Sequence, residues 1–285
     1  MKQLSLKKWN WQIGEGAPLA YMLGLNVLED EALALETGQE LQRVLKAMGR
    51  TFVFKASFDK ANRSSIKSFR GAGIEGGLKI LAKVGAKLGV PLITDVHTPE
   101  QCEQVAAVAD IVQIPAFLCR QTDLVVAAAR AVEKSGGLLH VKKGQFLAPW
   151  DCRNILSKVK EAAPSRDFTI LCERGVSFGY NNLVVDMLGI PEMRALGAPV
   201  TIDATHAVQL PGAGKGNGGE NTATGGRRSG VETLALASVA SGADGVFLEF
   251  HPNPDQAKCD GPSAWPLAEA GRLLKKIEAV RAAVS

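Results

Sequence analysis

Apolar runs of strand length recur along the chain, and a segment with helical periodicity follows each of them. The runs occupy residues 19–25, 51–54, 92–94, 111–114, 138–141, 168–171, 200–202 and 246–248. The helical segments occupy residues 31–48, 73–88, 99–107, 124–134, 151–162, 183–196, 231–241 and 264–284. Strands that alternate with helices pair in parallel through crossover connections. Eight such units in roughly 260 residues predict a closed (β/α)8 TIM barrel rather than a doubly wound open sheet.

The chain begins outside this rhythm. Residues 4–6 and 11–13 are two short β-like runs around a polar segment, which predicts a small hairpin within residues 1–16. No composition break or linker interrupts the residues that follow. We therefore predict a single α/β domain over residues 1–285, a barrel with a short N-terminal β-hairpin.

A polar or charged residue follows every predicted strand. The carboxyl ends of parallel barrel strands meet at one face, where barrel enzymes place their chemistry. The residues at these ends are Asn26, Lys55, Asp95 with His97, Gln113, Lys142 with Lys143, Arg174, Asp203 with His206, and Glu249 with His251. The pattern predicts a polar active site at this face.

The stretch at residues 52–71 leads from a strand into a polar segment rich in cations. So many charges cannot be buried unpaired, so the chain must leave the core near Lys55. Residues 62–65, Asn-Arg-Ser-Ser, then offer a guanidinium fork, hydroxyls and an amide. These are the donors that anionic oxygens prefer, and the segment therefore predicts an anion site.

Charge and cysteine content narrow the class of function. The chain has 33 Lys and Arg against 29 Asp and Glu, a net charge of +4 that is too balanced for binding nucleic acid by bulk charge. Small anionic metabolites are the expected partners. Five cysteines, odd in number and without a Cys-x-x-Cys pair, indicate reduced thiols. Since no signal peptide or membrane-spanning run is visible, we expect a cytoplasmic protein without a membrane partner.

Two glycine-rich segments suggest nucleotide or phosphate binding. Residues 71–76 match Gly-x-Gly-x-x-Gly, and Asp95 follows at the spacing of a ribose-binding acid, which raises the hypothesis of an NAD-linked oxidoreductase. A polar stretch separates these glycines from the strand, however, and this favours a simple helix entry. Residues 210–226 lack the order of a phosphate-binding loop and predict a long flexible connection, with a mobile lid as one role.

His206, Glu249 and Asp260 lie near the ends of the last two predicted strands. Imidazole and carboxylates form either a metal site or a hydrogen-bonded polar cluster without metal, and these three residues alone leave both open. A catalytic triad has little support, because the chain contains no Gly-x-Ser-x-Gly elbow.

Lys142 offers two kinds of chemistry. A desolvated lysine at the end of a barrel strand can form a Schiff base, as in barrel aldolases. The neighbouring cations Lys143 and Arg174 instead favour a role for Lys142 as one arm of a phosphate clamp.

Six segments share their residues with one known family. They are FKASFDKANRSS at 54–65, ITDVH at 93–97, QIPAFL at 113–118, CERG at 172–175, FGY at 178–180 and KCDGP at 258–262. Together they resemble 3-deoxy-D-manno-octulosonate 8-phosphate synthase over residues 19–274. The resemblance implies a barrel transferase that condenses phosphoenolpyruvate with D-arabinose 5-phosphate and water and releases phosphate, for lipopolysaccharide or pectin synthesis. It also implies a homotetramer.

The resemblance further assigns site residues. Those that would hold phosphoenolpyruvate are Lys55, Lys60, Gln113, Lys142 and Arg174. Asn62, Arg63 and Ser64 would hold D-arabinose 5-phosphate. Ala116 would also bind substrate, without an assignment to one of the two. Phe117 would reach toward a neighbouring subunit's site. The catalytic set is Asn26, Asp95, His206, Glu249 and Asp260, of which the last three would face the water and the aldehyde, with their individual roles open.

The family divides by its use of metal. Metal-dependent members place a cysteine where this chain has Asn26, which completes a Cys, His, Glu and Asp ligand set. An amide is a poor ligand for a soft metal beside a thiolate, so we expect an enzyme without metal or other cofactor. The nearest rival is 3-deoxy-D-arabino-heptulosonate 7-phosphate synthase, which uses erythrose 4-phosphate and metal. Residues 62–65 and Asn26 favour the arabinose enzyme, and a non-catalytic phosphate-binding barrel is a further alternative.

Overall fold

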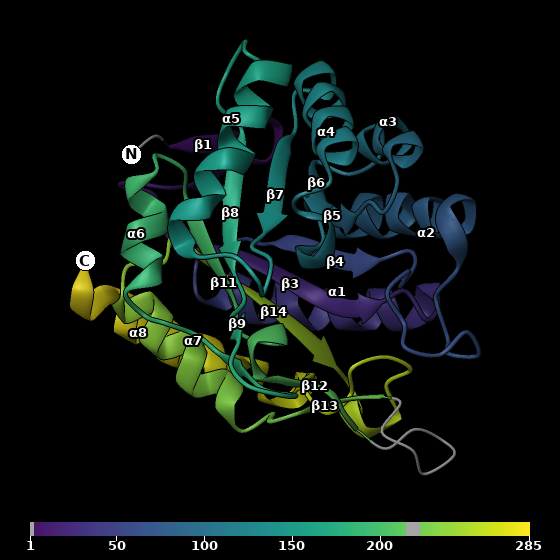
Figure 1. Cartoon of the computed structure of the whole chain (residues 1–285). Coiled ribbons are helices and arrows are strands. Elements are labelled where there is room, and N and C mark those ends of the chain that lie inside the picture. Colours follow the sequence, from purple (N-terminus) through teal and green to yellow (C-terminus); the bar gives the residue numbers. More distant parts are fainter. Residues whose placement is uncertain (1–2, 215–222) are drawn as a thin grey trace.

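Eight parallel strands form a closed barrel in the computed structural model, which describes residues 3–214 and 223–285 (Figure 1). The strands are β3 (Ala20–Val27), β4 (Val53–Ser57), β5 (Leu92–Asp95), β6 (Ile111–Ile114), β7 (Leu138–Lys142), β8 (Thr169–Glu173), β11 (Val200–Asp203) and β14 (Gly245–His251). They pair in chain order, and β14 joins β11 to β3. The predicted α/β barrel is therefore confirmed.

The helices lie outside the sheet, one after each barrel strand (Figure 1). They are α1 (Glu31–Ala47), α2 (Gly73–Leu88), α3 (Cys102–Ala106), α4 (Thr122–Ser135), α5 (Cys152–Ala162), α6 (Gly189–Ala195), α7 (Gly230–Ala240) and α8 (Ala270–Val284). None of the helices in the described residues is both long and apolar enough to cross a membrane.

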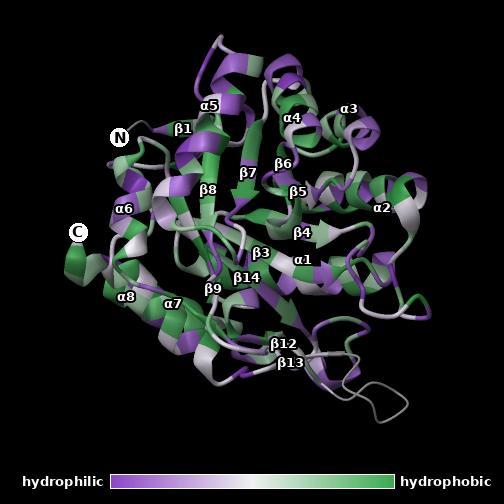
Figure 2. Cartoon of the chain, in the orientation of Figure 1, coloured by the Kyte–Doolittle hydropathy of each residue, from purple (hydrophilic) through white to green (hydrophobic). Residues whose placement is uncertain are grey.

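The sequence pattern explains why the strands are interior. Strands of a parallel barrel are covered on both sides, so they consist of nearly continuous apolar residues, whereas the outer helices carry polar residues on their exposed sides. Figure 2 shows β7 and β8 as hydrophobic ribbons surrounded by helices of mixed hydropathy. Gly24 allows a close approach between β3 and β4, because a Cβ atom there would lie 2.0 Å from the Lys55 carbonyl oxygen.

Some predicted helical segments are broken in the structure. Pro99 starts a 3-10 turn (Pro99–Gln101) before the short helix α3, because proline favours the first turn. The segment at residues 183–196 opens with a strand, β10 (Leu183–Val184), which pairs with β9 (Val176–Ser177). The last segment begins with β15 (Trp265–Pro266) and a 3-10 turn (Leu267–Glu269) before α8.

The long connection predicted at residues 210–226 contains paired strands. Its ends, β12 (Gln209–Gly214) and β13 (Ala223–Gly226), form an antiparallel pair. That the two ends of this connection pair as strands was not predicted from the sequence. Residues 215–222, where the predicted lid would have its tip, lie outside the described residues.

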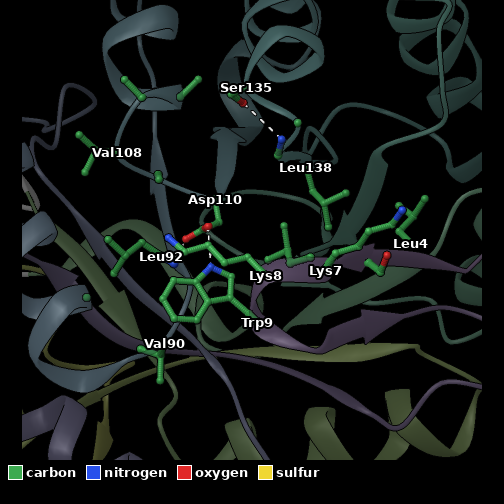
Figure 3. A pocket seen from close by; sticks show the side chains of 18 of the residues that line it. Leu4, Lys7, Lys8, Trp9, Val90, Leu92, Val108, Asp110, Ser135 and Leu138 are labelled. Atoms are coloured by element: carbon green, nitrogen blue, oxygen red, sulfur yellow. Dashed lines mark hydrogen bonds between the residues drawn. The ribbon is translucent and has the colours of Figure 1, made fainter.

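The predicted N-terminal hairpin is present, and it packs at the amino-terminal face of the barrel. Strands β1 (Leu4–Leu6) and β2 (Trp11–Ile13) pair antiparallel around a 3-10 turn (Lys7–Trp9). The Trp9 indole nitrogen donates to Asp110 Oδ1 at 2.6 Å, just before β6 begins. A cavity of about 880 Å³ lies beside this contact (Figure 3). No residue of the predicted site lines it, so the candidate chemistry lies elsewhere.

Candidate active site at the carboxyl-terminal face

Four predicted catalytic residues meet at the carboxyl ends of β3 and β14. The Asn26 amide nitrogen lies 2.5 Å from Glu249 Oε2 and 3.1 Å from Asp260 Oδ2. It also lies 3.4 Å from His206 Nε2. The amide thus occupies the point on which one imidazole and two carboxylates converge. Asn26 thus contacts all three residues that the sequence left open as a metal site or a polar cluster.

Asp260 is held in place by a specific backbone conformation. It has a positive φ of 52°, which non-glycine residues adopt rarely and Asp tolerates better than most. Two helix-like hydrogen bonds to its carbonyl oxygen, from the backbone N–H groups of Ser263 and Ala264, fix the turn. The carboxylate is thereby directed toward Asn26 from a loop distant in sequence.

Lys55 and Glu249 form an ion pair inside the barrel, and both side chains are 1% exposed. Lys55 Nζ also donates to the Asn26 carbonyl oxygen at 2.8 Å. Burial lowers the pKa of Lys55 to about 8, although the Glu249 charge acts in the opposite direction. Burial alone would raise the pKa of Glu249, but the charges of His206 and Lys55 lower it to about 2. Glu249 is therefore ionised, and Lys55 is a cation that titrates in an accessible pH range.

Lys142 and His206 share one buried carboxylate. Asp203 Oδ2 lies 2.6 Å from Lys142 Nζ and 2.7 Å from His206 Nδ1. Asp203 Oδ1 accepts the backbone N–H of His206 at 2.8 Å. Burial alone would raise the pKa of Asp203, but the His206 and Lys142 charges hold it well below the usual range. The direct pairing of Lys142 with this ionised carboxylate favours the clamp over the Schiff base.

Lys143, the next residue, makes contacts separate from those of Lys142. Its side chain is buried, and Nζ donates to the Leu147 carbonyl oxygen at 3.3 Å and lies 3.4 Å from Glu173 Oε1. Lys142 and Lys143 therefore pair with different carboxylates, Asp203 and Glu173.

Two further cations offer charge to a ligand. Arg174 Nη2 donates to Gln209 Oε1 at 3.0 Å, while the buried Nη1 has no partner among the described residues. Burial alone would lower the pKa of Lys60, but the carboxylates of Asp95 and Glu249 raise it. A buried guanidinium nitrogen without a partner is costly unless an anion completes it.

Asp95 lies beside this group at the end of β5. Its Oδ2 atom is 3.0 Å from His97 Nε2, and its buried Oδ1 atom has no hydrogen-bond partner among the described residues. Burial alone would raise the pKa of Asp95, but the hydrogen bond to His97 and the Lys60 charge lower it. An ionised carboxylate with a free acceptor oxygen can orient a hydroxyl group or a water.

The polar segment after β4 carries the predicted sugar-phosphate residues. Asn62 and Ser64 are exposed, and Arg63 is half-buried with Nη1 at 2.7 Å from Cys259 Sγ. Burial raises the pKa of the Cys259 thiol to about 12, so Arg63 contacts a neutral sulfur, which is a weak acceptor. The Arg63 Nε atom is buried without a partner among the described residues. Arg63 therefore has donors available for a stronger acceptor.

The same segment separates β4 from the glycines at residues 71–76. Helix α2 begins only at Gly73, after the whole polar loop. A dinucleotide site requires the strand to run directly into the glycines, so this geometry contradicts the oxidoreductase hypothesis. Gly71 has a φ of 120°, and a Cβ atom there would lie 2.4 Å from the Phe58 carbonyl oxygen. These glycines serve the return of the chain to the barrel.

Ala116 and Phe117 follow β6 in a 3-10 turn (Ala116–Leu118). Ala116 is buried, whereas the Phe117 side chain is 54% exposed. Other exposed apolar side chains occur in the loops after β7 and β8, namely Phe146, Trp150, Phe178, Tyr180, Val184 and Leu188. The aromatic members of this set, Phe117, Phe146, Trp150, Phe178 and Tyr180, are called the aromatic patch.

Two residues that hold the site together were not given a specific role from the sequence: Asp203 was named only as a polar strand end, and His140 was not singled out. Asp203 is the last residue of β11 and lies three residues before His206. This spacing was the signal from which a contact between the two side chains could have been predicted. His140 lies within the apolar run of β7, is fully buried and contacts Gln113 Oε1 at 3.1 Å through Nδ1. A polar residue inside an otherwise apolar strand is unusual enough to mark it.

The chain is similar in sequence to known proteins. A model of the DAHP synthetase I family matches residues 2–284. The 2-dehydro-3-deoxyphosphooctonate aldolases of Citrifermentans bemidjiense and of a Geobacter species are each 51% identical over 274 residues, which is 96% of each chain. The enzyme of the same name from Thiobacillus denitrificans is 49% identical over 279 residues, 98% of this chain and 95% of its own.

Proposed function

The chain belongs to the DAHP synthetase I family, and we propose that it acts as a 2-dehydro-3-deoxyphosphooctonate aldolase. This enzyme condenses phosphoenolpyruvate with D-arabinose 5-phosphate and water to give 3-deoxy-D-manno-octulosonate 8-phosphate and phosphate. The product is a precursor of the acid sugar of lipopolysaccharide. The observation that carries the proposal is the convergence of Lys55, Lys60, Lys142 and Arg174 on one face of the barrel. Two substrates with phosphate and carboxylate groups require such a set of cations.

The proposal divides the face between the two substrates. Lys55, Lys60, Gln113, Lys142 and Arg174 hold phosphoenolpyruvate. Ala116 also binds substrate and is not assigned to either of the two. Asn62, Arg63 and Ser64 hold the sugar phosphate. The free Nη1 of Arg174 and the free Nε of Arg63, judged over the described residues, support one anion near each arginine.

The chemistry forms a carbon–carbon bond without a covalent enzyme intermediate. The enol carbon of phosphoenolpyruvate attacks the aldehyde carbon, the aldehyde oxygen takes up a proton, and positive character develops at C2. Water adds to C2 and loses a proton, and cleavage of the C2–O bond then expels phosphate. The enzyme aligns two anions, polarises the aldehyde oxygen and directs the water, so positioning and electrostatics supply the rate enhancement. Asn26, Asp95, His206, Glu249 and Asp260 serve these tasks.

The proposed enzyme works without a metal ion. The support is the Asn26 amide, whose nitrogen lies 2.5 to 3.4 Å from His206, Glu249 and Asp260. An amide donor satisfies carboxylates that would otherwise require a cation, and it offers no thiolate to a soft metal.

The proposal also includes a cytoplasmic homotetramer folded as one domain. The aromatic patch supports association, because large apolar side chains that are exposed on neighbouring loops are typical of protein interfaces. All five cysteines are buried free thiols, which supports a reducing compartment.

Release of phosphate from phosphoenolpyruvate tests the proposed function. The protein is incubated with phosphoenolpyruvate and either D-arabinose 5-phosphate or erythrose 4-phosphate, and inorganic phosphate is measured. We expect phosphate release in the mixture that contains D-arabinose 5-phosphate and none in the mixture that contains erythrose 4-phosphate. Release only with erythrose 4-phosphate would instead identify the heptulosonate synthase. Binding of phosphoenolpyruvate without release in either mixture would leave a non-catalytic phosphate-binding barrel.

A further inference from the structure

His140 links two strands inside the barrel. Its Nδ1 atom lies 3.1 Å from Gln113 Oε1 on β6, and its Nε2 atom lies 2.9 Å from Thr201 Oγ1 on β11. The ring stacks on Phe247, with 5.9 Å between centroids and an interplanar angle of 11°. All of these groups are buried. The imidazole therefore has a fixed position and two polar partners.

The ring carries only one N–H proton. Burial, together with the nearby Lys142 charge, lowers the pKa of His140 to about 3, so the imidazole is neutral at physiological pH. A neutral imidazole donates from one nitrogen and accepts at the other. The partners decide which nitrogen donates.

Thr201 decides this arrangement, because its hydroxyl has one proton and two acceptors within reach. His140 Nε2 is 2.9 Å away, whereas the Leu171 carbonyl oxygen is 3.3 Å away, beyond the usual range of an O–H···O hydrogen bond. The hydroxyl therefore donates to Nε2, and the proton of the ring resides on Nδ1. From there it is donated to Gln113 Oε1.

We propose that His140 is a positioning residue that holds the carboxamide of Gln113 with its oxygen inward and its NH2 group toward the phosphoenolpyruvate site. The inference rests on the proposed function for the identity of the anion. Gln113 Nε2 makes no hydrogen bond to any other described residue, so its donors are free for a ligand. In the reverse orientation, the carboxamide would present an oxygen to a carboxylate or phosphate and repel it.

The tautomer of His140 tests this arrangement without reference to activity. The chain has four histidines, so two-bond 1H–15N correlation spectra of histidine-labelled protein are simple, and His140→Asn identifies the signal. The Nδ1–H tautomer is expected, unchanged between pH 6 and 8. The Nε2–H tautomer would overturn the proposal, whether or not the protein turns over phosphoenolpyruvate.

Kinetics of paired variants test the effect on substrate. His140→Leu should raise KM for phosphoenolpyruvate about tenfold or more through loss of a charge-assisted hydrogen bond, with KM for the sugar phosphate unchanged. His140→Asn should restore most of the affinity, because its amide N–H group is attached at the same carbon as Nδ1. In a Gln113→Ala background, His140→Leu should have no further effect on this KM. An additive effect there would show a merely structural role and contradict the proposal.

Discussion

The Asn26 amide nitrogen lies 2.5 Å from Glu249 Oε2, across the seam where the first and last barrel strands meet. The same Glu249 carboxylate binds Lys55 through its other oxygen. Glu249 therefore joins the uncharged centre of the polar cluster to a cation that we assign to phosphoenolpyruvate. Replacing Asn26 should change the chemistry of this centre more than the fold around it.

We expect full activity after exhaustive treatment with a strong chelator, because the Asn26 amide satisfies the surrounding carboxylates. Phosphate release is measured before and after chelation, and then with added Mn²⁺, Zn²⁺ or Cd²⁺. Loss of activity that a divalent metal restores would contradict metal independence.

The substitution Asn26→Cys should create a metal site with His206, Glu249 and Asp260. A thiolate completes a set of soft and borderline ligands. The expected readout is a thiolate-to-metal charge-transfer band on addition of Co²⁺, with the Asn26→Ser variant as a control that lacks it. If Asn26→Cys binds no Co²⁺, the geometry of the cluster has been misassigned.

The pH dependence of kcat/KM for phosphoenolpyruvate should report Lys55. Its pKa is lowered by burial to about 8, so the charge is present below this pH and is lost above it. Since kcat/KM reports groups of the free enzyme, it should fall as the pH rises through about 8.

Thermal unfolding measurements distinguish the loss of the Lys55 charge in the active site from a loss of protein stability at high pH. An unfolded lysine keeps its proton to about pH 10.4, so between pH 8 and 10 the unfolded state binds more protons and the contribution of Lys55 to stability rises with pH. Lys55 itself therefore predicts no loss of Tm in the range where kcat/KM declines. A flat kcat/KM profile to pH 9.5 would rule out Lys55 as the titrating group.

The barrel and much of the site were predictable because position along a parallel strand determines the face. Asn26, Gln113 and Glu249 come from different strands, yet each lies near a carboxyl end, and that is enough to bring them to one face. The direction of neighbouring side chains was less predictable. Lys142 and Lys143 are adjacent in sequence, and only the folded structure shows that Lys142 pairs with Asp203 whereas Lys143 pairs with Glu173.

Contacts between three strands could not be predicted from the sequence. The arrangement of Gln113, His140 and Thr201 depends on distances between β6, β7 and β11, which no local pattern records. The pairing of β12 with β13 was missed for a related reason. Glycine-rich segments have weak strand propensity, and antiparallel pairing across a long connection overrides it.

The substitution Arg63→Ala should weaken binding of D-arabinose 5-phosphate. Removal of a charge-assisted hydrogen bond to phosphate costs about 1.5 to 3 kcal/mol, so KM for the sugar phosphate should rise roughly ten- to a hundredfold. The matched control is Lys67→Ala, which removes an exposed cation of the same loop. Equal effects of the two variants would reduce Arg63 to a contribution of general charge.

The aromatic patch should be the site of self-association. The loops that carry it are in contact, because the Ser177 N–H group donates to the Gln145 carbonyl oxygen at 3.0 Å and so connects the loop of Phe146 to that of Phe178. The Phe178 side chain is 70% exposed. The substitution Phe178→Glu would place a charge in any interface formed there, so it should convert a tetramer into smaller species.

Light scattering after size-exclusion chromatography measures the mass of each variant in this test. The control is Val284→Glu, which introduces the same charge at an exposed apolar residue at the end of α8.

If Phe117 reaches a neighbouring site, Phe117→Ala should lower kcat/KM while the assembly persists, because it removes one side chain without adding a charge. A monomeric wild-type protein with full activity would contradict both the tetramer and the role of Phe117, since no neighbouring subunit would then be present to receive that side chain.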